Sequence, residues 1–261
     1  MTNSEAKIQA RIVENLTAQG ISLPVYTYDT IDSTNVEAKR IFSLQPSSYL
    51  LVANHQSKGK GRVGRTFYSP CDTGLYMTLV YREPMQMSVA ALATQATAVA
   101  VRRAILKETK IPTAIKWVND IYFQGKKVGG ILVESVQGME SDFLQGIVIG
   151  IGVNLSTEAF PLELQTIAGK LGGGERESLC AKIVAELLPL LQGLPNSAFL
   201  KEYEQHCFLI GQPIEFQKNG TMYEGTALSI DAQGGLVVGL TTGETTVLQS
   251  GEVSIRTQRK G

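Results

Sequence analysis

The sequence predicts an α+β protein built from a mixed β-sheet with helices on one face, followed by a small β-barrel. Three observations support this. Strand-like apolar runs and amphipathic stretches succeed one another up to about residue 208. The alanine-rich stretch 88–108 is typical of a long buried helix. After Gly211 the chain changes to short β-rich runs separated by turns. We therefore expect two domains, 1–208 and 209–261.

The elements of the first domain are predicted from local patterns. The amphipathic stretch 5–16 predicts a helix, and Asp32-Ser33-Thr34-Asn35 is predicted to open a second helix that runs to about Leu44. Its Thr34-x-x-Glu37 spacing fits a capping box, in which two side chains satisfy free backbone N–H groups. Further helices are predicted at 88–108, 175–191 and 196–206. Strands are predicted at 25–28, 49–55, 75–81, 113–117, 120–123, 128–136 and 142–150.

The C-terminal segment carries repeated turn signals. Asn219-Gly220 lies between alternating segments and predicts a tight hairpin, because both residues tolerate positive φ. Glycine-containing turns follow at 231–235 and 242–244. Five short strands in about 50 residues favour a small closed barrel.

Composition excludes several classes of protein. Of 261 residues, 43% are hydrophobic and 18% charged, which is ordinary for a soluble globular enzyme. Lys+Arg and Asp+Glu both number 24, which argues against a general nucleic-acid binder. We expect no membrane span, because no apolar run reaches the roughly 18 residues that one needs. Cys71, Cys180 and Cys207 show no CxxC spacing, so we expect reduced thiols and a cytoplasmic location.

The segment 56–65, Gln-Ser-Lys-Gly-Lys-Gly-Arg-Val-Gly-Arg, is the most informative part of the chain. It holds three glycines, four cations and no acid. Glycines let backbone N–H groups approach a ligand, and Lys and Arg bind phosphate-bearing anions. The dinucleotide fingerprint and the P-loop both need a helix directly after the glycines, but Pro70 interrupts the next segment. We predict a loop that binds a nucleotide or an adenylate; the alternative is a solvated surface loop.

A second dense segment is Lys116-Trp117-Val118-Asn119-Asp120, and a third, Lys127-Val128-Gly129-Gly130-Ile131-Leu132-Val133-Glu134, follows it. In a regular strand, Lys116, Val118 and Asp120 share one face, and Trp117 and Asn119 share the other. Glycine within a strand often marks the close approach of a ligand or another backbone. The alternative is an ordinary hairpin with a solvated lysine turn.

Two shorter segments are ambiguous when taken alone. Gly150-Ile151-Gly152-Val153-Asn154 is interpreted as the end of an apolar strand, which suits either the edge of a site or a plain turn. Asp32-Ser33-Thr34-Asn35 suits either a helix cap or a site for the polar head of a ligand.

Together these five segments resemble a biotin protein ligase in composition, order and spacing. The resemblance covers about residues 25–156 closely, and the family's SH3-like C-terminal domain agrees in kind with the predicted barrel. It implies a catalytic domain like those of class II aminoacyl-tRNA synthetases and biotin ligases. It also implies that biotin and ATP, with Mg²⁺, form biotinyl-5′-adenylate and pyrophosphate. Biotin would then pass to one lysine of the biotin carboxyl carrier protein of acetyl-CoA carboxylase.

The resemblance also assigns roles to residues. Lys127 matches the active-site lysine, and Arg62 and Asp120 complete the implied catalytic group. Asp120 is in addition the candidate to orient Mg²⁺ or the incoming lysine. The implied biotin-binding residues are Ser33, Thr34, Asn35, Gln56, Gly59, Lys60, Gly61, Arg62, Lys127 and Gly130. The implied nucleotide-binding residues are Arg62, Arg65, Trp117, Asn119, Lys127 and Asn154.

The chain departs from the family pattern at two positions. Lys60 replaces the first arginine of the family loop, which keeps the charge but loses bidentate geometry. Val118 replaces the usual proline of Lys-Trp-Pro-Asn-Asp. Only residues 1–24 precede the core, too few for the winged-helix domain of DNA-binding members, so we expect no specific DNA binding.

Other functions remain open from the sequence. A lipoate–protein ligase has a related fold and the same adenylate chemistry, and a non-catalytic biotin or nucleotide sensor would need the same cavity. The glycine-rich loop could instead serve a homodimer, since the sequence does not determine oligomeric state. Its glycines also predict disorder in the free protein and ordering with ligand.

Overall fold

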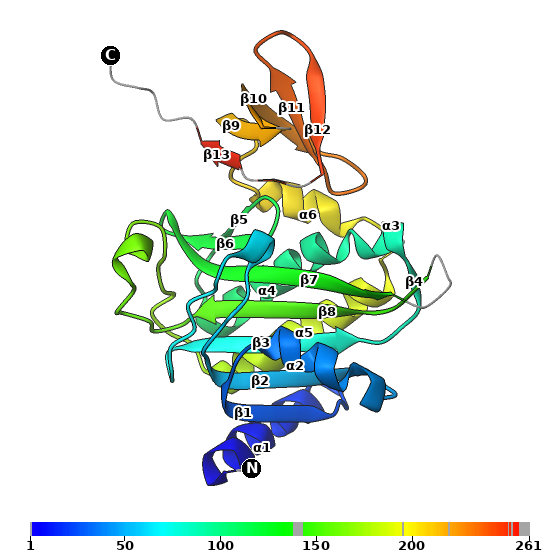
Figure 1. Ribbon diagram of the computed structural model, residues 1–261, viewed down its shortest axis with the longest axis vertical. Coiled ribbons are helices and arrows are strands. Elements are labelled where there is room, and N and C mark those ends of the chain that lie inside the picture. Colours follow the sequence, from blue (N-terminus) through cyan, green and yellow to red (C-terminus); the bar gives the residue numbers. More distant parts are fainter. Residues whose placement is uncertain are drawn as a thin grey trace.

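The computed structural model describes residues 2–137, 143–194, 196–218, 220–249, 251 and 253–255, which form two sheets (Figure 1). The larger sheet is mixed: β1 and β2 are parallel, and the remaining pairs are antiparallel. Its order is β1-β2-β3-β8-β7-β6-β5, with β4 on the end of β8. The predicted α+β class is confirmed. The strands are β1 Val25–Ile31, β2 Tyr49–Gln56, β3 Gly74–Tyr81, β4 Met85–Gln86, β5 Ala114–Lys116, β6 Asp120–Phe123, β7 Lys126–Gln137 and β8 Phe143–Asn154.

Helices cover both faces of this sheet, rather than one as the sequence suggested. The long helices α1, α4 and α5 lie on one face, and the short helix α2 lies on the other (Figure 1). The apolar residues of β2 divide accordingly: Leu50 and Val52 join the α4–α5 cluster, whereas Tyr49 and Leu51 join the α2 cluster. The helices are α1 Asn3–Ala18, α2 Thr34–Ile41, α3 Met87–Ala90, α4 Ala93–Thr109, α5 Arg176–Gln192 and α6 Phe199–His206, with short 3-10 helices at Phe42–Leu44, Arg62–Gly64 and Leu162–Leu164.

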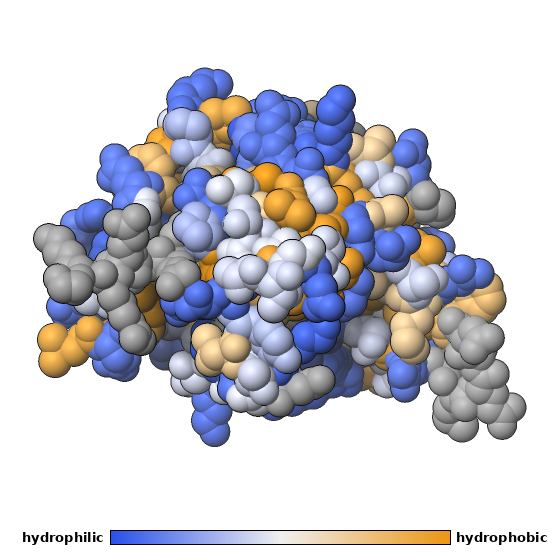
Figure 2. Space-filling model, turned by 90° about the horizontal axis from the view of Figure 1, so that it is seen from above, coloured by the Kyte–Doolittle hydropathy of each residue, from blue (hydrophilic) through white to orange (hydrophobic). Residues whose placement is uncertain are grey.

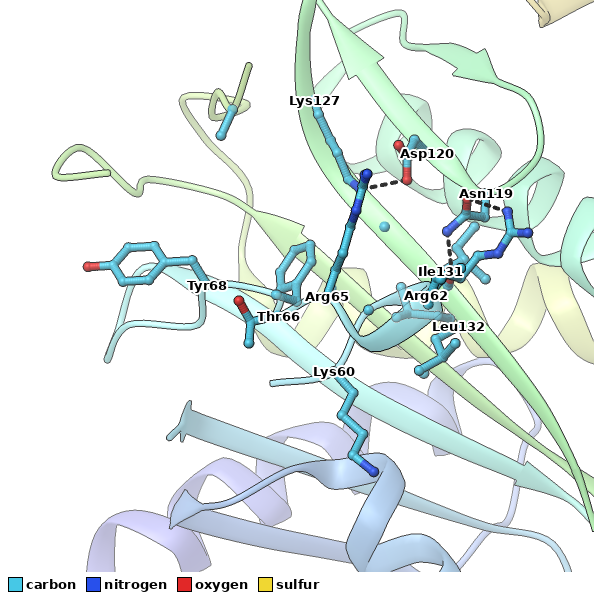
Figure 3. Close-up of a pocket in the computed structure, with 18 of the residues that line it drawn as sticks. Lys60, Arg62, Arg65, Thr66, Tyr68, Asn119, Asp120, Lys127, Ile131 and Leu132 are labelled. Carbon is cyan, nitrogen blue, oxygen red and sulfur yellow. Dashed lines mark hydrogen bonds and ion pairs between the residues drawn. The ribbon is translucent and has the colours of Figure 1, made fainter. Parts of the chain in front are cut away.

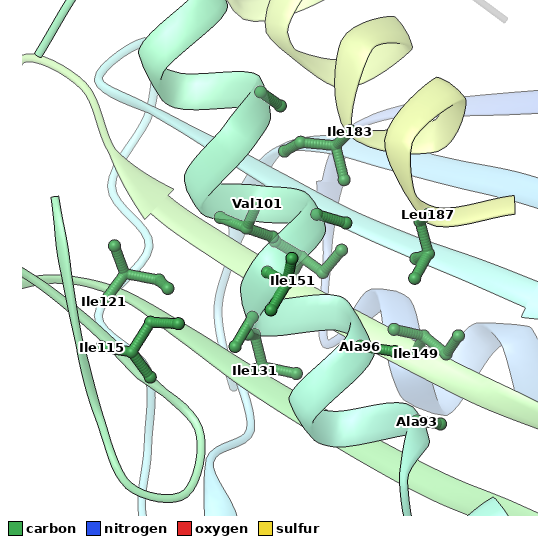
Figure 4. Close-up of a cluster of buried hydrophobic side chains, with 14 of the residues drawn as sticks. Ala93, Ala96, Val101, Ile115, Ile121, Ile131, Ile149, Ile151, Ile183 and Leu187 are labelled. Atoms are coloured by element: carbon green, nitrogen blue, oxygen red, sulfur yellow. The ribbon is translucent and has the colours of Figure 1, made fainter. Parts of the chain in front are cut away.

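The predicted single helix 88–108 is two helices, α3 and α4, in the structure. The segment Met87–Thr109 is long and apolar enough to cross a membrane by length and composition, contrary to the expectation from the sequence. However, 72% of its apolar window is buried within the protein. Figure 4 shows the reason: α4 lies between the sheet residues Ile149 and Ile151 and the α5 residues Ile183 and Leu187. It is a core helix.

The capping box predicted at Thr34 is wrong. Ser33 precedes the first turn of α2 and makes no side-chain cap bond, while the Thr34 hydroxyl is directed to other partners. The structure instead has a capping box at α1, where Thr2 and Glu5 bond to each other's backbone N–H groups. Both segments fit the sequence pattern, and only one uses it.

Gly150 and Gly152 lie inside β8, not at a strand end as predicted, because the strand continues to Asn154. Close packing requires both glycines. A Cβ at Gly150 would lie 2.2 Å from Asn35 Oδ1, and one at Gly152 would lie 2.4 Å from the Phe67 ring. The plain-turn alternative for this segment is therefore wrong.

The five strands expected near the C-terminus form an antiparallel sheet in the order β12-β11-β10-β9-β13. Lys218 pairs with Thr221, which confirms the predicted hairpin, although Asn219 lies outside the described residues. Within the described residues β12 and β13 are not paired, so closure of the barrel is not seen. Hydrophobic surface on this end of the molecule is broken into small areas by hydrophilic residues (Figure 2). These strands are β9 Pro213–Lys218, β10 Thr221–Ile230, β11 Leu236–Leu240, β12 Thr245–Leu248 and β13 Val253–Ile255.

Candidate functional site

A cavity of about 300 Å³ opens where the start of α2, the glycine-rich loop, the β5–β7 region, β8 and residues 160–168 meet (Figure 3). Gly130, Gly150 and Gly152 line it along the sheet. Part of the small sheet, Gly251, Val253 and Ser254, also reaches it. The predicted site residues that line it are Ser33, Thr34, Gln56, Lys60, Gly61, Arg62, Arg65, Asn119, Asp120, Lys127, Gly130 and Asn154.

One group of lining residues is neutral: Ser33 and Thr34 are buried, and Thr34 is hydrogen-bonded to the half-buried Gln56. Gln56 Oε1 accepts from the Thr34 backbone N–H at 2.9 Å and lies 3.1 Å from the Thr34 hydroxyl. Gln56 Nε2 donates to Ser69 Oγ at 3.0 Å. Ser33 and Thr34 are 2% and 3% exposed, so their polar groups are held away from bulk water. Such a group is fixed in position before any ligand binds.

Asn35 and Gly59, which were predicted to bind biotin, do not line the cavity. Asn35 lies beneath Gly150, where its Oδ1 accepts from the Thr78 hydroxyl at 2.7 Å and its Nδ2 donates to Glu134 at 2.9 Å. Gly59 is buried against the return of its own loop, and a Cβ there would lie 2.3 Å from the Phe67 carbonyl oxygen. Both residues support the cavity wall from behind.

The cationic loop folds as a compact turn. The Gly61 N–H donates to the Arg65 carbonyl at 2.8 Å, and the Phe67 N–H donates to the Gly59 carbonyl at 2.9 Å. Lys60 and Arg65 are exposed, whereas Arg62 is half-buried and donates to Asn119 Oδ1 at 3.2 Å. Figure 3 shows Arg65 extending toward Asp120 while Lys60 points away toward α2. The loop therefore lines the cavity, although several of its side chains are also exposed to solvent.

Lys127 and Asp120 form an ion pair, with Nζ 2.6 Å from Oδ1, on the cavity wall (Figure 3). Both side chains are partly exposed, at 32% and 20%. Gly130 leaves them room, because a Cβ there would lie 3.3 Å from Lys127 Cε. The neighbouring Lys126 is directed elsewhere and donates to the Gln165 carbonyl at 3.1 Å. The hairpin thus sends one lysine to the cavity and the other to an adjacent loop.

The predicted division of faces over residues 116–120 is wrong. The segment is a hairpin in which Lys116 pairs with Asp120, so Asn119 lines the cavity together with both of them. Asn119 is held in place by its Nδ2, which donates to the Ile131 carbonyl at 2.7 Å. Trp117 is 3% exposed and does not line the cavity; its Nε1 donates to the Gly234 carbonyl at 3.0 Å.

Asn154 lies at the end of β8 and lines the cavity. Its Nδ2 donates to the Gly169 carbonyl at 3.0 Å, and its buried Oδ1 has no hydrogen-bond partner among the described residues. A buried acceptor without a partner costs free energy, so this oxygen is placed to accept from a ligand donor.

Sequence analysis missed the aromatic and apolar part of the cavity. Phe67 and Tyr68 follow the cationic loop, and the Tyr68 ring lies 6.2 Å from that of Phe160. For Phe160 and the apolar residues that follow it, the only signal was their hydrophobicity, because residues 156–174 have neither helix nor strand periodicity. The missed lining residues include Phe67, Tyr68, Phe160, Leu164, Ile167 and Ala168.

The described residues do not form a ready metal site. No group of three or more His, Cys, Asp or Glu among them could hold a metal ion. Asp120, the one candidate from the sequence, is already paired with Lys127. All three cysteines are free thiols, as expected. The cavity therefore offers cations and neutral hydrogen-bonding groups rather than a metal cage.

Comparison with known families finds two matches. Residues 27–154 match the biotin/lipoate A/B protein ligase family, and residues 209–256 match the biotin protein ligase C-terminal domain. The bifunctional ligase/repressor BirA of Bacillus spizizenii is 33% identical over 224 residues, which are 80% of this chain and 67% of the relative. A biotin–[acetyl-CoA-carboxylase] ligase of Mycobacterium tuberculosis is 26% identical over 235 residues, which are 85% of each chain.

Solved structures agree with these matches. The biotin protein ligase of Aquifex aeolicus in complex with biotin and ATP superposes with a TM-score of 0.72 at 26% identity. The superposition covers 89% of this chain and 98% of the Aquifex chain, so it includes both sheets.

Proposed function

The chain belongs to the biotin protein ligase family, and we infer that it is an ATP-dependent ligase that forms biotinyl-5′-AMP and transfers biotin to a carrier protein. One observation supports this inference at the level of residues. A single cavity contains both a neutral, prearranged hydrogen-bonding group and a cluster of cations around Lys127. Biotin and ATP need both features. The ureido ring of biotin is neutral and needs hydrogen-bonding partners, whereas the reacting carboxylate and phosphate groups are anions and need cations.

We propose that Ser33, Thr34 and Gln56 bind the ureido ring. Ser33 and Thr34 supply buried hydroxyl and backbone groups, and the half-buried Gln56 supplies an amide. At such a site, a ligand that cannot form the matching hydrogen bonds leaves polar groups unpaired and binds more weakly. The thiophene ring would lie along the part of the sheet that lines the cavity at Gly130, Gly150 and Gly152.

In the first step a biotin carboxylate oxygen attacks the α-phosphorus of ATP, and the bond from that phosphorus to the pyrophosphate oxygen breaks. Two anions must approach, and at about 4 Å unit charges repel by about 4 kcal/mol near a protein surface. We propose that Lys127 and Arg62 offset this repulsion, with Lys127 oriented by Asp120 and Arg62 by Asn119. Asn154 and Arg65 would contact the nucleotide.

In the second step the amine of the target lysine attacks the acyl carbon of biotinyl-AMP, and AMP leaves. The attacking amine must lose a proton, which would pass to water or to the phosphate of the departing AMP. We propose that Asp120 orients this amine, since its carboxylate lies on the cavity wall. Closure of the cationic loop would keep water from hydrolysing the mixed anhydride.

Mg²⁺ would enter with the phosphates of ATP rather than occupy a protein cage. Mg²⁺ commonly keeps several waters and uses one or two carboxylates plus substrate phosphates. The described residues provide no cluster of metal ligands, so no step is assigned to a metal held by the protein.

Several finer assignments are proposals as well. The partner would be the biotin carboxyl carrier protein of acetyl-CoA carboxylase, without specific DNA binding, and the location would be cytoplasmic. A homodimer is the alternative to a monomer. The division into domains 1–208 and 209–261 is also proposed; α6 and the first strand of the small sheet lie on either side of it.

A mass-spectrometric assay tests the function. Purified protein, ATP and Mg²⁺ are mixed with a biotin carboxyl carrier domain, with biotin or lipoate in parallel. We expect one biotinyl group on the carrier, absent with Lys127→Ala. Transfer of lipoate alone would keep the chemistry but change the substrate. Biotin binding without any transfer would favour the sensor.

A further inference from the structure

The only tryptophan of the chain joins the turn between β5 and β6 to the small sheet. Trp117 Nε1 donates to the carbonyl oxygen of Gly234, which lies in the turn between β10 and β11 of the small sheet. Gln95 Nε2 of α4 donates to the same oxygen at 2.9 Å. Trp117 and Gln95 are 3% and 4% exposed, so this three-residue contact is dry.

The small sheet presents Gly234 on a rigid turn. Asp231 Oδ1 accepts from the backbone N–H groups of Gln233 at 2.9 Å and Gly235 at 2.7 Å. Gly234 has φ +80°, and a Cβ there would lie 2.4 Å from Gln95 Nε2. Only glycine fits this position without displacing the contact.

Gln95 carries a cost that points to a specific role. Its Oε1 is buried and has no hydrogen-bond partner among the described residues. Burial of such an acceptor is unfavourable, and an apolar side chain of similar size would avoid it. What glutamine adds here is the second hydrogen bond to Gly234.

The chain directly after Trp117 lines the cationic part of the cavity. Two and three residues after Trp117 come Asn119, which binds Arg62, and Asp120, which binds Lys127. The intervening Val118 carbonyl accepts from the buried Tyr203 hydroxyl of α6 at 3.0 Å. Any movement of Trp117 would therefore shift the partners of Arg62 and Lys127.

We infer that Trp117, Gln95 and Gly234 are positioning residues through which the small sheet sets the nucleotide end of the cavity. Among the described residues, no hydrogen bond joins Thr34 or Gln56 to this group, so we expect a smaller effect at the biotin end. This inference rests on the proposed function and extends it, because it gives the C-terminal sheet a specific part in ATP use.

The test compares two glycine substitutions in the small sheet. Gly234→Ala disturbs the contact, whereas Gly225→Ala is a matched control whose Cβ would lie 2.5 Å from the Gly239 carbonyl oxygen, within the small sheet. Pyrophosphate release gives KM for ATP and for biotin. We expect Gly234→Ala to raise KM for ATP about tenfold and to change KM for biotin less than about twofold. We expect Gly225→Ala to lower Tm without raising KM for ATP more than KM for biotin.

Fluorescence gives a second readout, because Trp117 is the sole tryptophan. We expect its emission to shift to longer wavelength in Gly234→Ala and to stay unchanged in Gly225→Ala. If Gly234→Ala does not fold, Trp117→Phe provides a second test because it removes the N–H donor. We expect it to raise KM for ATP more than KM for biotin, as in Gly234→Ala.

An equal rise of KM for ATP in both glycine variants, or no rise in Gly234→Ala and Trp117→Phe, would overturn the inference. If the wild-type protein released no pyrophosphate, the proposed function would fail instead. Calorimetric ATP binding and Trp117 emission would then still decide the role of the contact.

Discussion

The two polar groups of the cavity differ in how far the fold fixes them before a ligand binds. Thr34 and Gln56 are tied to each other, to the start of α2 and to the sheet by short hydrogen bonds. Lys60, Arg62 and Arg65 stand on a loop that backbone hydrogen bonds close into a turn, but their side chains are half-buried or exposed. The comparison suggests that selectivity for biotin is built into the rigid end, while the charged end depends on its ligand to become ordered.

The largest expected effect is the loss of the lysine at the charged end. Lys127→Ala leaves Asp120 without its partner and removes the cation that offsets repulsion during attack. We expect adenylate formation, measured by pyrophosphate release, to fall about 10²- to 10³-fold. Biotin binding by calorimetry is expected to persist. Lys201→Ala, an exposed lysine of α6 outside the cavity, serves as the control. Adenylate formation that persists in Lys127→Ala would show that this lysine is not the cation that offsets the repulsion between the reacting anions.

A smaller effect is expected from Arg62, the loop arginine that donates to Asn119. Arg62→Gly removes the guanidinium held by Asn119 and loosens the loop. We expect the adenylate to escape and modify bystander lysines about 10- to 100-fold more than with the wild type. Mass spectrometry of a carrier domain mixed with an unrelated protein measures this. Unchanged target selectivity would contradict the proposed role of Arg62.

The rigid end can be tested with an isosteric change. Thr34→Val removes the hydroxyl that lies close to Gln56 and Thr78 and keeps the shape. We expect Kd for biotin to rise about 5- to 30-fold and Kd for ATP to stay unchanged. Thr97→Val is the matched control, because Thr97 is equally buried but its hydroxyl bonds within α4. Equal loss of biotin affinity in both variants would point to a general packing effect.

The smallest expected effect concerns the order of the loop itself. Lys58, Lys60, Arg62 and Arg65 are trypsin sites in or beside the glycine-rich turn. We expect saturating biotin to slow cleavage at 57–66, because an ordered loop resists proteolysis. Mass spectrometry of the fragments over time measures the rates. Equal rates with and without biotin would mean that the two ends do not differ in this way.

The fold and much of the site were predictable from the sequence for local reasons. Continuous apolar runs fit β2 and β3 because these strands are buried on both faces. The density of glycine and cations at 56–65 predicted a cavity-lining loop because few surface segments need both. The segments containing Thr34, Gln56 and Lys127 also reach one cavity, as the resemblance implied.

The sequence failed where a distant contact decides the role of a residue. Thr34 fitted a capping box, but its hydroxyl is directed to Gln56 and Thr78. Asn119 was placed opposite Lys116, but a hairpin turn brings both to the cavity. The role of Phe160 could not be predicted from the sequence, because its segment has no periodicity. Its place in the cavity wall depends on the contact of its ring with that of Tyr68.

By itself, the sequence determined the α+β class, the order of the main elements and the chemistry of the charged loop. These follow from local spacing, burial patterns and residue type, which need no knowledge of neighbours. Tertiary structure alone decided that Gly150 and Gly152 make room for Asn35 and Phe67, and that Trp117 bonds to Gly234. Such roles depend on which surfaces meet when the chain closes, and residues 117 positions apart have no local pattern that records their contact.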